Sequence, residues 1–239
     1  MKTIAVASAK GGVGKSSLCA GVGSALAAAG KRVLLCDMDI GVRSLDIFLG
    51  VAQSTVYNWG DIVDGNCEPE TALLKIKNNL TLLAAPLDFS DSFTGEALKK
   101  AIDSFADSFD YVIFDAPAGL ECGFKLAAYC AESCIIVSTP DAVSIRAAAC
   151  AALNVRKTGI EDLRLVINRF NKKAKDNVCI DDIIDTVSAR LIGIVPEAPE
   201  IRAFSNGAPI PDKSRGRQSY ERIARRLCGE NIPLNFRLL

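Results

Sequence analysis

The residues best suited to chemistry lie in a glycine-rich segment close to the N-terminus, Ala9-Lys10-Gly11-Gly12-Val13-Gly14-Lys15-Ser16-Ser17. Its glycines allow successive backbone N–H groups to face one anion, and the N-terminus of a following helix adds partial positive charge. The lysine before the serines can reach the terminal phosphates of a nucleotide, and the first serine hydroxyl can ligate Mg²⁺. The segment predicts a nucleotide-binding phosphate loop formed by Gly11, Gly12, Val13, Gly14, Lys15, Ser16 and Ser17.

Three aspartates stand at the ends of apolar runs that have the composition of buried strands. Asp37 and Asp39 follow the run Val33-Leu34-Leu35-Cys36, and Asp115 follows Tyr111-Val112-Ile113-Phe114. Ligands of parallel α/β sheets bind at the carboxyl ends of the strands, so these carboxylates are candidate site residues. An apolar strand that closes on one aspartate is the Walker B arrangement, in which the carboxylate holds Mg²⁺ through a water. We therefore expect Asp115 at a metal site.

The loop departs from the standard phosphate loop, since Ala9 replaces the first glycine and Lys10 adds a second lysine. In this form it resembles the deviant phosphate loop of the MinD/ParA family of ATPases. The resemblance implies that Lys10 reaches across a homodimer interface to the nucleotide of the other copy. An extra cation there stabilises charge on the transferring phosphoryl group, an effect of about 10³–10⁵ in rate for arginine fingers. Hydrolysis would then depend on dimerisation.

The stretch from Asp37 to Asp46 reads D-x-D-I-G-x-R-x-L-D and is similar to the MinD branch of that family. The resemblance implies that Asp39 positions the attacking water and that Asp37 supports the metal region. The catalytic set would be Lys10, Lys15 and Asp39, and the metal set would be Ser16, Asp37 and Asp115. Gly119, in a turn that is also of the MinD form, would lie beside the γ-phosphate and form with Asp39 the switch between ATP and ADP states.

The ends of two later predicted strands are candidates for recognition of the nucleotide base. Asn168 and Arg169 end one apolar run, and Pro196 and Glu197 follow the next. Members of the family place an asparagine or a similar residue against the adenine edge, and a Pro-Glu turn beside the base. An amide can pair with the donor and the acceptor of adenine together, which would favour ATP over GTP. An asparagine that merely ends a strand is an equally natural interpretation.

Elements that could position these residues follow from hydrophobic patterning. Short β-branched runs alternate with longer amphipathic or alanine-rich ones, which is typical of βαβ units. We expect strands over 2–8, 32–37, 80–84, 111–115, 134–138, 163–168 and 191–195. We expect helices over 16–29, 94–108, 121–131, 142–157, 181–189 and 220–227. The predicted fold is α/β of the P-loop NTPase type, with a single doubly wound, mostly parallel sheet, helices on both faces and one domain over residues 1–229.

Composition excludes several classes of protein. The chain has 239 residues, of which 49% are hydrophobic and 23% are charged, and these values indicate a folded rather than a disordered chain. It holds no histidine, which excludes Ser-His-Asp catalysis, Cys-His catalysis and His-ligated metals. Lys+Arg and Asp+Glu balance at 28 each, so a generally basic nucleic-acid binder is not expected. No apolar run reaches the roughly 18–20 residues needed to span a bilayer.

The nine cysteines contain no C-x-x-C pair, and most lie in apolar stretches, where a free cysteine behaves as a small hydrophobe. An odd number of cysteines without a credible secretory signal indicates a reducing compartment, so we expect a cytoplasmic protein. Cys130 and Cys134 would lie one helical turn apart, which leaves a metal or cluster role open as an alternative.

The resemblance also implies ligands and partners. It implies ATP/ADP and Mg²⁺, a homodimer in the ATP state, and division-site placement with a MinC-like inhibitor and a topological regulator. Ala147 stands where members regulated by MinE carry an acidic residue, which argues against that regulator. Residues 230–239 stand in place of the Lys-rich amphipathic membrane helix of the family. Pro233 discourages a helix there and Arg237 is the one base, so any peripheral contact at the inner face of the cell membrane should be weak. Three interpretations stay open: a vestigial anchor, a natural chain that continues beyond Leu239, and a protein that works without a membrane.

A basic segment near the C-terminus supports an alternative function. Between residues 202 and 226, seven bases outnumber Asp212 and Glu221. Relatives of the ParA type bind DNA through such a face, and phosphate contacts would make that binding steeply salt-dependent. The alternative is therefore a ParA- or FlhG-like positioning ATPase that acts on DNA or on a protein scaffold. A solvated helix face is the interpretation that we favour, so DNA binding is not expected.

Overall fold

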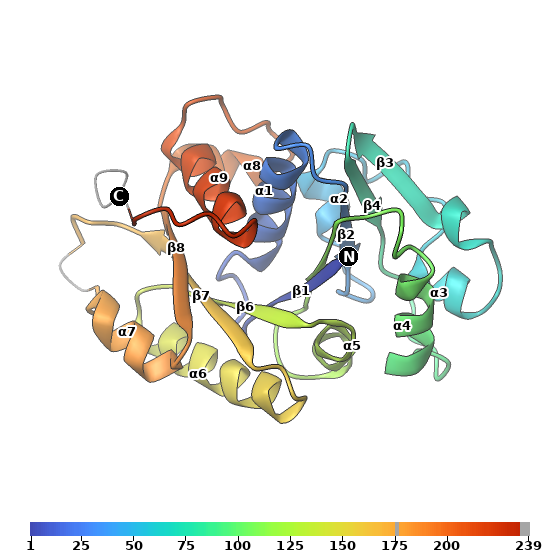
Figure 1. Cartoon of the computed structure of the whole chain (residues 1–239), viewed down its shortest axis with the longest axis horizontal. Helices are drawn as coiled ribbons and strands as arrows, with labels where there is room; N and C mark the ends of the chain where they lie inside the picture. Colours follow the sequence, from blue (N-terminus) through green and yellow to red (C-terminus); the bar gives the residue numbers. More distant parts are fainter. Residues whose placement is uncertain (175–176, 235–239) are drawn as a thin grey trace.

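The computed structural model describes residues 1–174 and 177–234. An eight-stranded sheet in the order β3-β4-β2-β5-β1-β6-β7-β8 runs through its centre (Figure 1). The strands are β1 (Lys2–Ala7), β2 (Val33–Asp37), β3 (Leu73–Lys77), β4 (Leu80–Leu83), β5 (Tyr111–Asp115), β6 (Ser133–Ser138), β7 (Asp162–Phe170) and β8 (Arg190–Pro196). β3 pairs antiparallel with β4, and the remaining neighbours are parallel. The predicted α/β class with a mostly parallel sheet is confirmed.

Helices cover both faces of this sheet. They are α1 (Lys15–Ala28), α2 (Leu45–Phe48), α3 (Trp59–Val63), α4 (Gly95–Asp103), α5 (Cys122–Cys130), α6 (Ala142–Lys157), α7 (Ile180–Val187), α8 (Pro199–Phe204) and α9 (Arg215–Leu227), with a 3₁₀ turn η1 (Pro69–Ala72). α1 and α9 pack together on one face, and α5, α6 and α7 lie on the other (Figure 1). Consecutive β1 residues accordingly alternate between two cores, with Ile4 and Val6 on the α1 side and Ala5 and Ala7 opposite.

Several elements differ from the expected ones. β3 was not predicted, because its lysines and half-exposed leucines give an edge strand little apolar signal. α2, α3 and α8 are too short to show a helical period. α4 ends at Asp103 rather than at residue 108. α9 begins at Arg215 rather than at 220, because the Ser214 side chain accepts a hydrogen bond from the Arg217 amide and caps the helix there.

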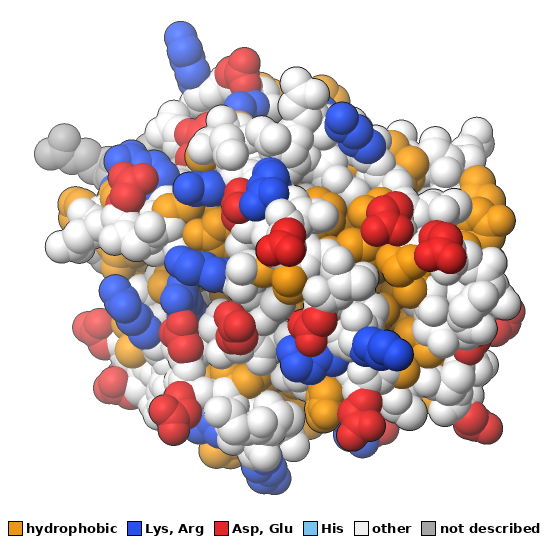
Figure 2. Space-filling view, turned by 45° about the vertical axis from the view of Figure 1, so that its right-hand side comes forward, with side chains coloured by type: hydrophobic (Ala, Val, Ile, Leu, Met, Phe, Trp, Pro, Cys, Tyr) orange, Lys and Arg blue, Asp and Glu red, His pale blue; other side chains and the backbone are white. Residues whose placement is uncertain are grey.

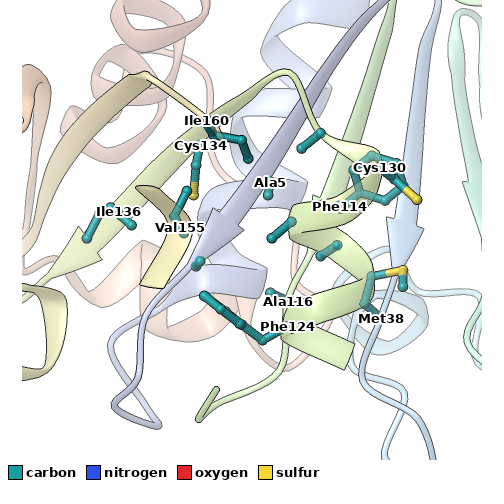
Figure 3. Packing of buried hydrophobic residues seen from close by; sticks show 14 of the residues in the cluster. Ala5, Met38, Phe114, Ala116, Phe124, Cys130, Cys134, Ile136, Val155 and Ile160 are labelled. Atoms are coloured by element: carbon teal, nitrogen blue, oxygen red, sulfur yellow. The ribbon is translucent and has the colours of Figure 1, made fainter. Parts of the chain in front are cut away.

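The expected helical spacing of Cys130 and Cys134 was wrong. Cys130 is the last residue of α5, and the extended Ala131 together with Glu132 separates it from β6, which holds Cys134. The two side chains lie in different parts of the core, Cys134 near Val155 and Cys130 on the far side of Phe114 (Figure 3). Burial raises the pKa of Cys130 to about 12 and raises that of Cys134 as well. Both thiols are therefore core residues, and within 1–174 and 177–234 no group of three His, Cys, Asp or Glu side chains could hold a metal ion.

The sheet brings the predicted site residues to one edge. β1 lies between β5 and β6 and runs directly into the glycine-rich loop. β2 and β5 are neighbours and end on Asp37 and Asp115, which are register partners. None of the helices in the described part of the chain is long and apolar enough to cross a membrane.

Candidate nucleotide site

The glycine-rich loop wraps directly into the first turn of α1. Gly14 adopts the left-handed conformation at φ +94° and is the residue before the helix, which begins at Lys15. A Cβ atom on Gly14 would lie 2.1 Å from the Asn168 amide nitrogen, so no other residue fits without moving that side chain. The loop and the unpaired amides of the helix N-terminus thus form the anion-binding geometry expected of a phosphate loop.

A cavity of about 480 Å³ opens beside this loop. The residues predicted from the sequence that line it are Gly11, Gly12, Gly14, Lys15, Ser16, Ser17, Asp39, Asn168, Arg169, Pro196 and Glu197. Lining residues that the sequence analysis did not assign to the site include Ser44, Phe48, Ile201, Arg202 and Ser205. Val13, Asp37 and Asp115 are buried behind the wall. One space therefore joins the phosphate loop to both strand ends that were assigned to the base.

Three oxygen-bearing side chains meet at the metal end of the cavity. The hydroxyls of Ser16 and Ser44 lie 3.0 Å apart, and Ser44 Oγ lies 3.4 Å from Asp115 Oδ2. Asp115 is buried, and burial together with the charge of Asp37 raises its pKa to about 7. A buried carboxylate beside two hydroxyls is a donor set that suits a hard cation such as Mg²⁺. Ser44 was missed because a serine within the D-x-D-I-G-x-R segment carries no signal of its own.

Asp37 has a different environment from the neighbouring Asp115. Its Oδ1 accepts a hydrogen bond from the Asp39 amide at 2.9 Å, and its Oδ2 accepts from the Ser44 and Leu45 amides at 2.8 and 2.9 Å. Burial raises the pKa of Asp37, and these three amides oppose the rise. Its carboxylate organises the loop that carries Asp39 and Ser44, and a direct part in metal binding stays a prediction.

Lys15 and Asp39 both line the cavity, and each affects the pKa of the other. Lys15 is 7% exposed, and burial lowers the pKa of its ammonium while Asp115, Cys19 and Asp39 oppose the shift. Asp39 is half-buried, and burial raises its pKa while Lys15 opposes the rise. A cation and a carboxylate are thus held at the place where terminal phosphates would meet the loop.

The amide of Asn168 is used by the phosphate loop itself. Its Nδ2 donates to the Val13 carbonyl at 2.7 Å, its Oδ1 accepts from the Arg169 amide at 2.9 Å, and the residue is 2% exposed. These bonds support the interpretation of Asn168 as a structural residue that braces the loop. A contact with adenine stays a prediction.

The base end of the cavity is formed largely by the segment after β8. Arg169 adopts φ +54°, and Arg202 lies 3.7 Å from the Glu197 carboxylate. Phe48 packs edge-on against Phe204 with ring centroids 5.5 Å apart, so α2 and α8 close this end together. Apolar walls beside a few polar groups suit a flat heterocycle.

Lys10 and Gly119 lie outside the main cavity. Lys10 lines a neighbouring cavity of about 460 Å³ that shares Gly11, Gly12, Arg169 and Glu197 with it. The Lys10 ammonium pairs with Asp141 Oδ1 at 2.9 Å. Gly119, at φ +91°, donates its amide to the Ala9 carbonyl at 3.2 Å and so ties the turn after β5 to the phosphate loop. Its part in a nucleotide switch stays a prediction.

Three of the arginines of α9 are engaged with the segment that follows the helix. Arg225 pairs with Glu230 at 2.7 Å, and Arg226 donates to the Ile232 and Pro233 carbonyls at 2.9 Å. Arg222 donates to the Pro233 carbonyl as well. On the face in Figure 2, Lys and Arg side chains are interspersed with Asp and Glu. These contacts support the structural interpretation of the basic segment rather than a DNA-binding face. Residues 235–239, the end of the expected tail, lie outside the described residues.

Comparison with known proteins places the chain in a family. Residues 4–210 match the CobQ/CobB/MinD/ParA nucleotide binding domain. The septum site-determining protein MinD of Bacillus subtilis is 39% identical over 98% of this chain and 91% of its own length, and that of Thermotoga maritima is 36% identical over 97% and 89%. The structure of the MinC:MinD cell division protein complex of Aquifex aeolicus superposes with a TM-score of 0.90 and 37% identity, covering 98% of this chain and 99% of that one. The chain belongs to the MinD branch of the MinD/ParA family of nucleotide-binding ATPases.

Proposed function

We propose that this chain is a Mg²⁺-dependent ATPase that dimerises on ATP, separates after hydrolysis, and acts as a spatial switch in division-site placement. The observation that carries the proposal is that the phosphate loop, Asp39 and Ser44 line one cavity, with the Asp115 carboxylate buried directly behind the Ser44 hydroxyl. Anion-binding amides, a buried lysine and a carboxylate at one place are what phosphoryl transfer to water requires.

Each group has a role that its surroundings support. The loop amides and Lys15 would bind the terminal phosphates, and the Ser16–Ser44–Asp115 oxygens would hold Mg²⁺, directly or through water. The metal would neutralise charge on the phosphates. Asp39, half-buried on the cavity wall, would accept a hydrogen bond from the attacking water and orient it. Little further covalent chemistry is needed.

The position of Lys10 supports action on a second copy. Its ammonium lies in the adjoining cavity, bound to Asp141, and not among the residues that line the main cavity. A lysine on the outer side of its own phosphate loop is better placed to meet another subunit than to complete its own site. We therefore assign Lys10 a catalytic role in trans within a symmetric homodimer.

Partners and location follow from the family. The Aquifex relative was solved as a MinC:MinD complex, and we propose a MinC-like inhibitor as a partner of this chain. We further propose a cytoplasmic protein with weak peripheral membrane contact in its dimeric state, in which two weak anchors act together.

A complementation assay tests the proposal. Lys10→Ala and Asp39→Ala should each abolish ATP hydrolysis, because one lacks the trans cation and the other lacks the water-orienting carboxylate. In a mixed dimer, the Lys10→Ala subunit keeps its own Asp39 and receives Lys10 from the other subunit. Equal mixing should therefore restore about a quarter of wild-type activity, since half of the dimers are mixed and each holds one complete site. A mixture as inactive as its parts would overturn the assignment of Lys10.

A further inference from the structure

We propose that Asp141 is a positioning residue that holds the Lys10 ammonium in cis, and that this ion pair has to open before the lysine can reach a second copy. The inference rests on the proposed function, because it takes Lys10 to act across a dimer. The ion pair then adds to the free energy of dimerisation a cost that arises within each single chain.

The acceptor of this ion pair is fixed in place. Asp141 is the N-cap of α6, and its Oδ1 accepts from the Ser144 amide at 2.9 Å as well as from Lys10 Nζ at 2.9 Å. Its Oδ2 accepts from Thr139 Oγ1 at 2.5 Å. A carboxylate bound by a helix amide and a hydroxyl cannot follow the lysine when the lysine moves. Opening therefore means that Lys10 leaves, not that the pair moves as one.

The charge of Asp141 is secure near neutral pH. Burial acts to raise the pKa of Asp141, but the bonds from Thr139, Lys10 and the Ser144 amide outweigh burial and leave the pKa below its usual range. The lysine is therefore held by a full negative charge. A phosphate group of the nucleotide bound to a second copy must compete with the Asp141 carboxylate for the Lys10 ammonium.

The pair is also exposed enough to be displaced. The side chains of Lys10 and Asp141 are 34% and 48% exposed. Ion pairs at such positions are weak, so a polyphosphate can outcompete the carboxylate. The surrounding cavity of about 460 Å³ is lined by polar groups such as Asn171 and Asn177 and gives the lysine room to swing. The Lys10–Asp141 ion pair can therefore open and close, unlike a permanent structural bridge, and we call it the latch.

Because the dimer is symmetric, the free energy of opening the ion pair counts twice. Both copies must open one pair each, so removal of the Asp141 charge should tighten the dimer by the square of the factor for one pair. Exposed pairs correspond to roughly 1.5- to 5-fold in an equilibrium constant, which gives about 2- to 25-fold in the dimer dissociation constant. A different role for Asp141, aiming Lys10 toward the second copy, predicts the opposite sign.

The test compares Asp141→Asn with the wild-type chain. Asparagine has nearly the same shape and is as good an N-cap as aspartate, so α6 keeps its cap while Lys10 loses a charged partner. Asp141→Ser, which also caps but is too short to reach the lysine, serves as a second variant if the first does not fold. Asp110→Asn is the matched control, because Asp110 pairs with Arg32 at 2.8 Å at the opposite ends of the strands, with comparable exposure.

Dimer dissociation constants are measured by sedimentation velocity with Mg²⁺ and a non-hydrolysable ATP analogue. We expect an about 2- to 25-fold tighter dimer for Asp141→Asn, no change for Asp110→Asn, and monomers throughout with ADP. If the wild type dimerises and Asp141→Asn is equal to it or weaker, the latch is wrong while the proposed function stands. If neither chain dimerises with the analogue, the proposed function fails and the latch fails with it.

Discussion

Asp37 and Asp115 end neighbouring parallel strands as register partners, yet their carboxylates have opposite surroundings. Asp37 accepts three backbone amides within 2.9 Å. Asp115 meets weaker donors, the Cys19 thiol at 3.5 Å and the Ser44 hydroxyl at 3.4 Å. The hydrogen-bonding capacity of the Asp37 carboxylate is therefore used within the protein, whereas the Asp115 carboxylate can still bind a ligand. Such a buried charge destabilises the nucleotide-free chain, as is common at functional sites.

Replacing Asp115 with asparagine should stabilise the nucleotide-free chain, and more so at pH 8 than at pH 5. The fold raises the pKa of this carboxyl from about 3.9 to about 7. Its protonated form therefore favours the folded state below the unfolded pKa, and that contribution is lost as the pH rises through the folded pKa. Asparagine does not ionise, so the Asp115→Asn chain does not lose this stability as the pH rises. We expect a higher Tm by several degrees at pH 8, at about 2–4 °C per kcal/mol for a chain of this size.

Thermal unfolding at the two pH values checks this, with Asp110→Asn as a control that should show no gain. The same Asp115→Asn chain should lose the extra stabilisation that Mg²⁺ adds to bound ADP. An equal Tm gain at both pH values would contradict the assignment of a buried charge at this position.

Asp37→Asn should loosen the loop that carries Asp39. An amide presents one acceptor oxygen where the carboxylate presents two, so its NH₂ group would oppose at least one of the amides of Asp39, Ser44 and Leu45. An unpaired buried donor costs about 1–3 kcal/mol. Hydrogen exchange should therefore accelerate by about tenfold or more at these three amides.

Asp61→Asn is the matched control for the loop. Asp61 accepts the Asn58 amide at 2.9 Å in the capping box of α3, and none of the amides of Asp39, Ser44 and Leu45 binds it. Faster exchange in that variant should be confined to α3. Unchanged protection of the Ser44 and Leu45 amides in Asp37→Asn would show that the loop is held by other contacts.

Asn168→Asp should weaken nucleotide binding through the phosphate loop. The carboxylate cannot donate to the Val13 carbonyl and would place negative charge behind the loop. We expect about tenfold weaker binding of a fluorescent ADP analogue, in line with the cost of one unsatisfied buried group. Asn154→Asp, on an exposed turn of α6, is the control. Binding equal to wild type would remove Asn168 from the support of the loop.

Tyr220→Phe should lower stability without abolishing nucleotide binding. Tyr220 OH lies 2.7 Å from Ser17 Oγ in a buried contact that ties α9 to the start of α1. Loss of this hydrogen bond should cost about 1 kcal/mol, or about 2–4 °C in Tm. Tyr129→Phe removes a hydroxyl from a residue that is 51% exposed and should change Tm by less. A Tm unchanged in Tyr220→Phe would show that α9 is held by packing alone.

Local sequence patterns were enough to predict the α/β class, the glycine-rich loop before α1 and the strand ends that carry Asp37, Asp39 and Asp115. These features depend on residues close together in the chain: a glycine-rich turn between an apolar run and a helix, or an acid that ends a β-branched run. Short or edge elements such as β3 and α2 escaped prediction, because a run of four or five residues shows no usable period. The start of α9 was missed because the capping serine stands before a strongly polar first turn.

Tertiary structure alone decided what each polar group does. Asp37 and Asp115 look alike in sequence, and they differ because the loop after β2 folds back over one of them. Asn168 meets Val13, and Lys10 meets Asp141, across 155 and 131 residues. Arg222 and Arg226 of α9 donate to backbone carbonyls that follow the helix. The partner of a polar side chain is set by which distant element packs against it, and neither composition nor local pattern encodes that choice.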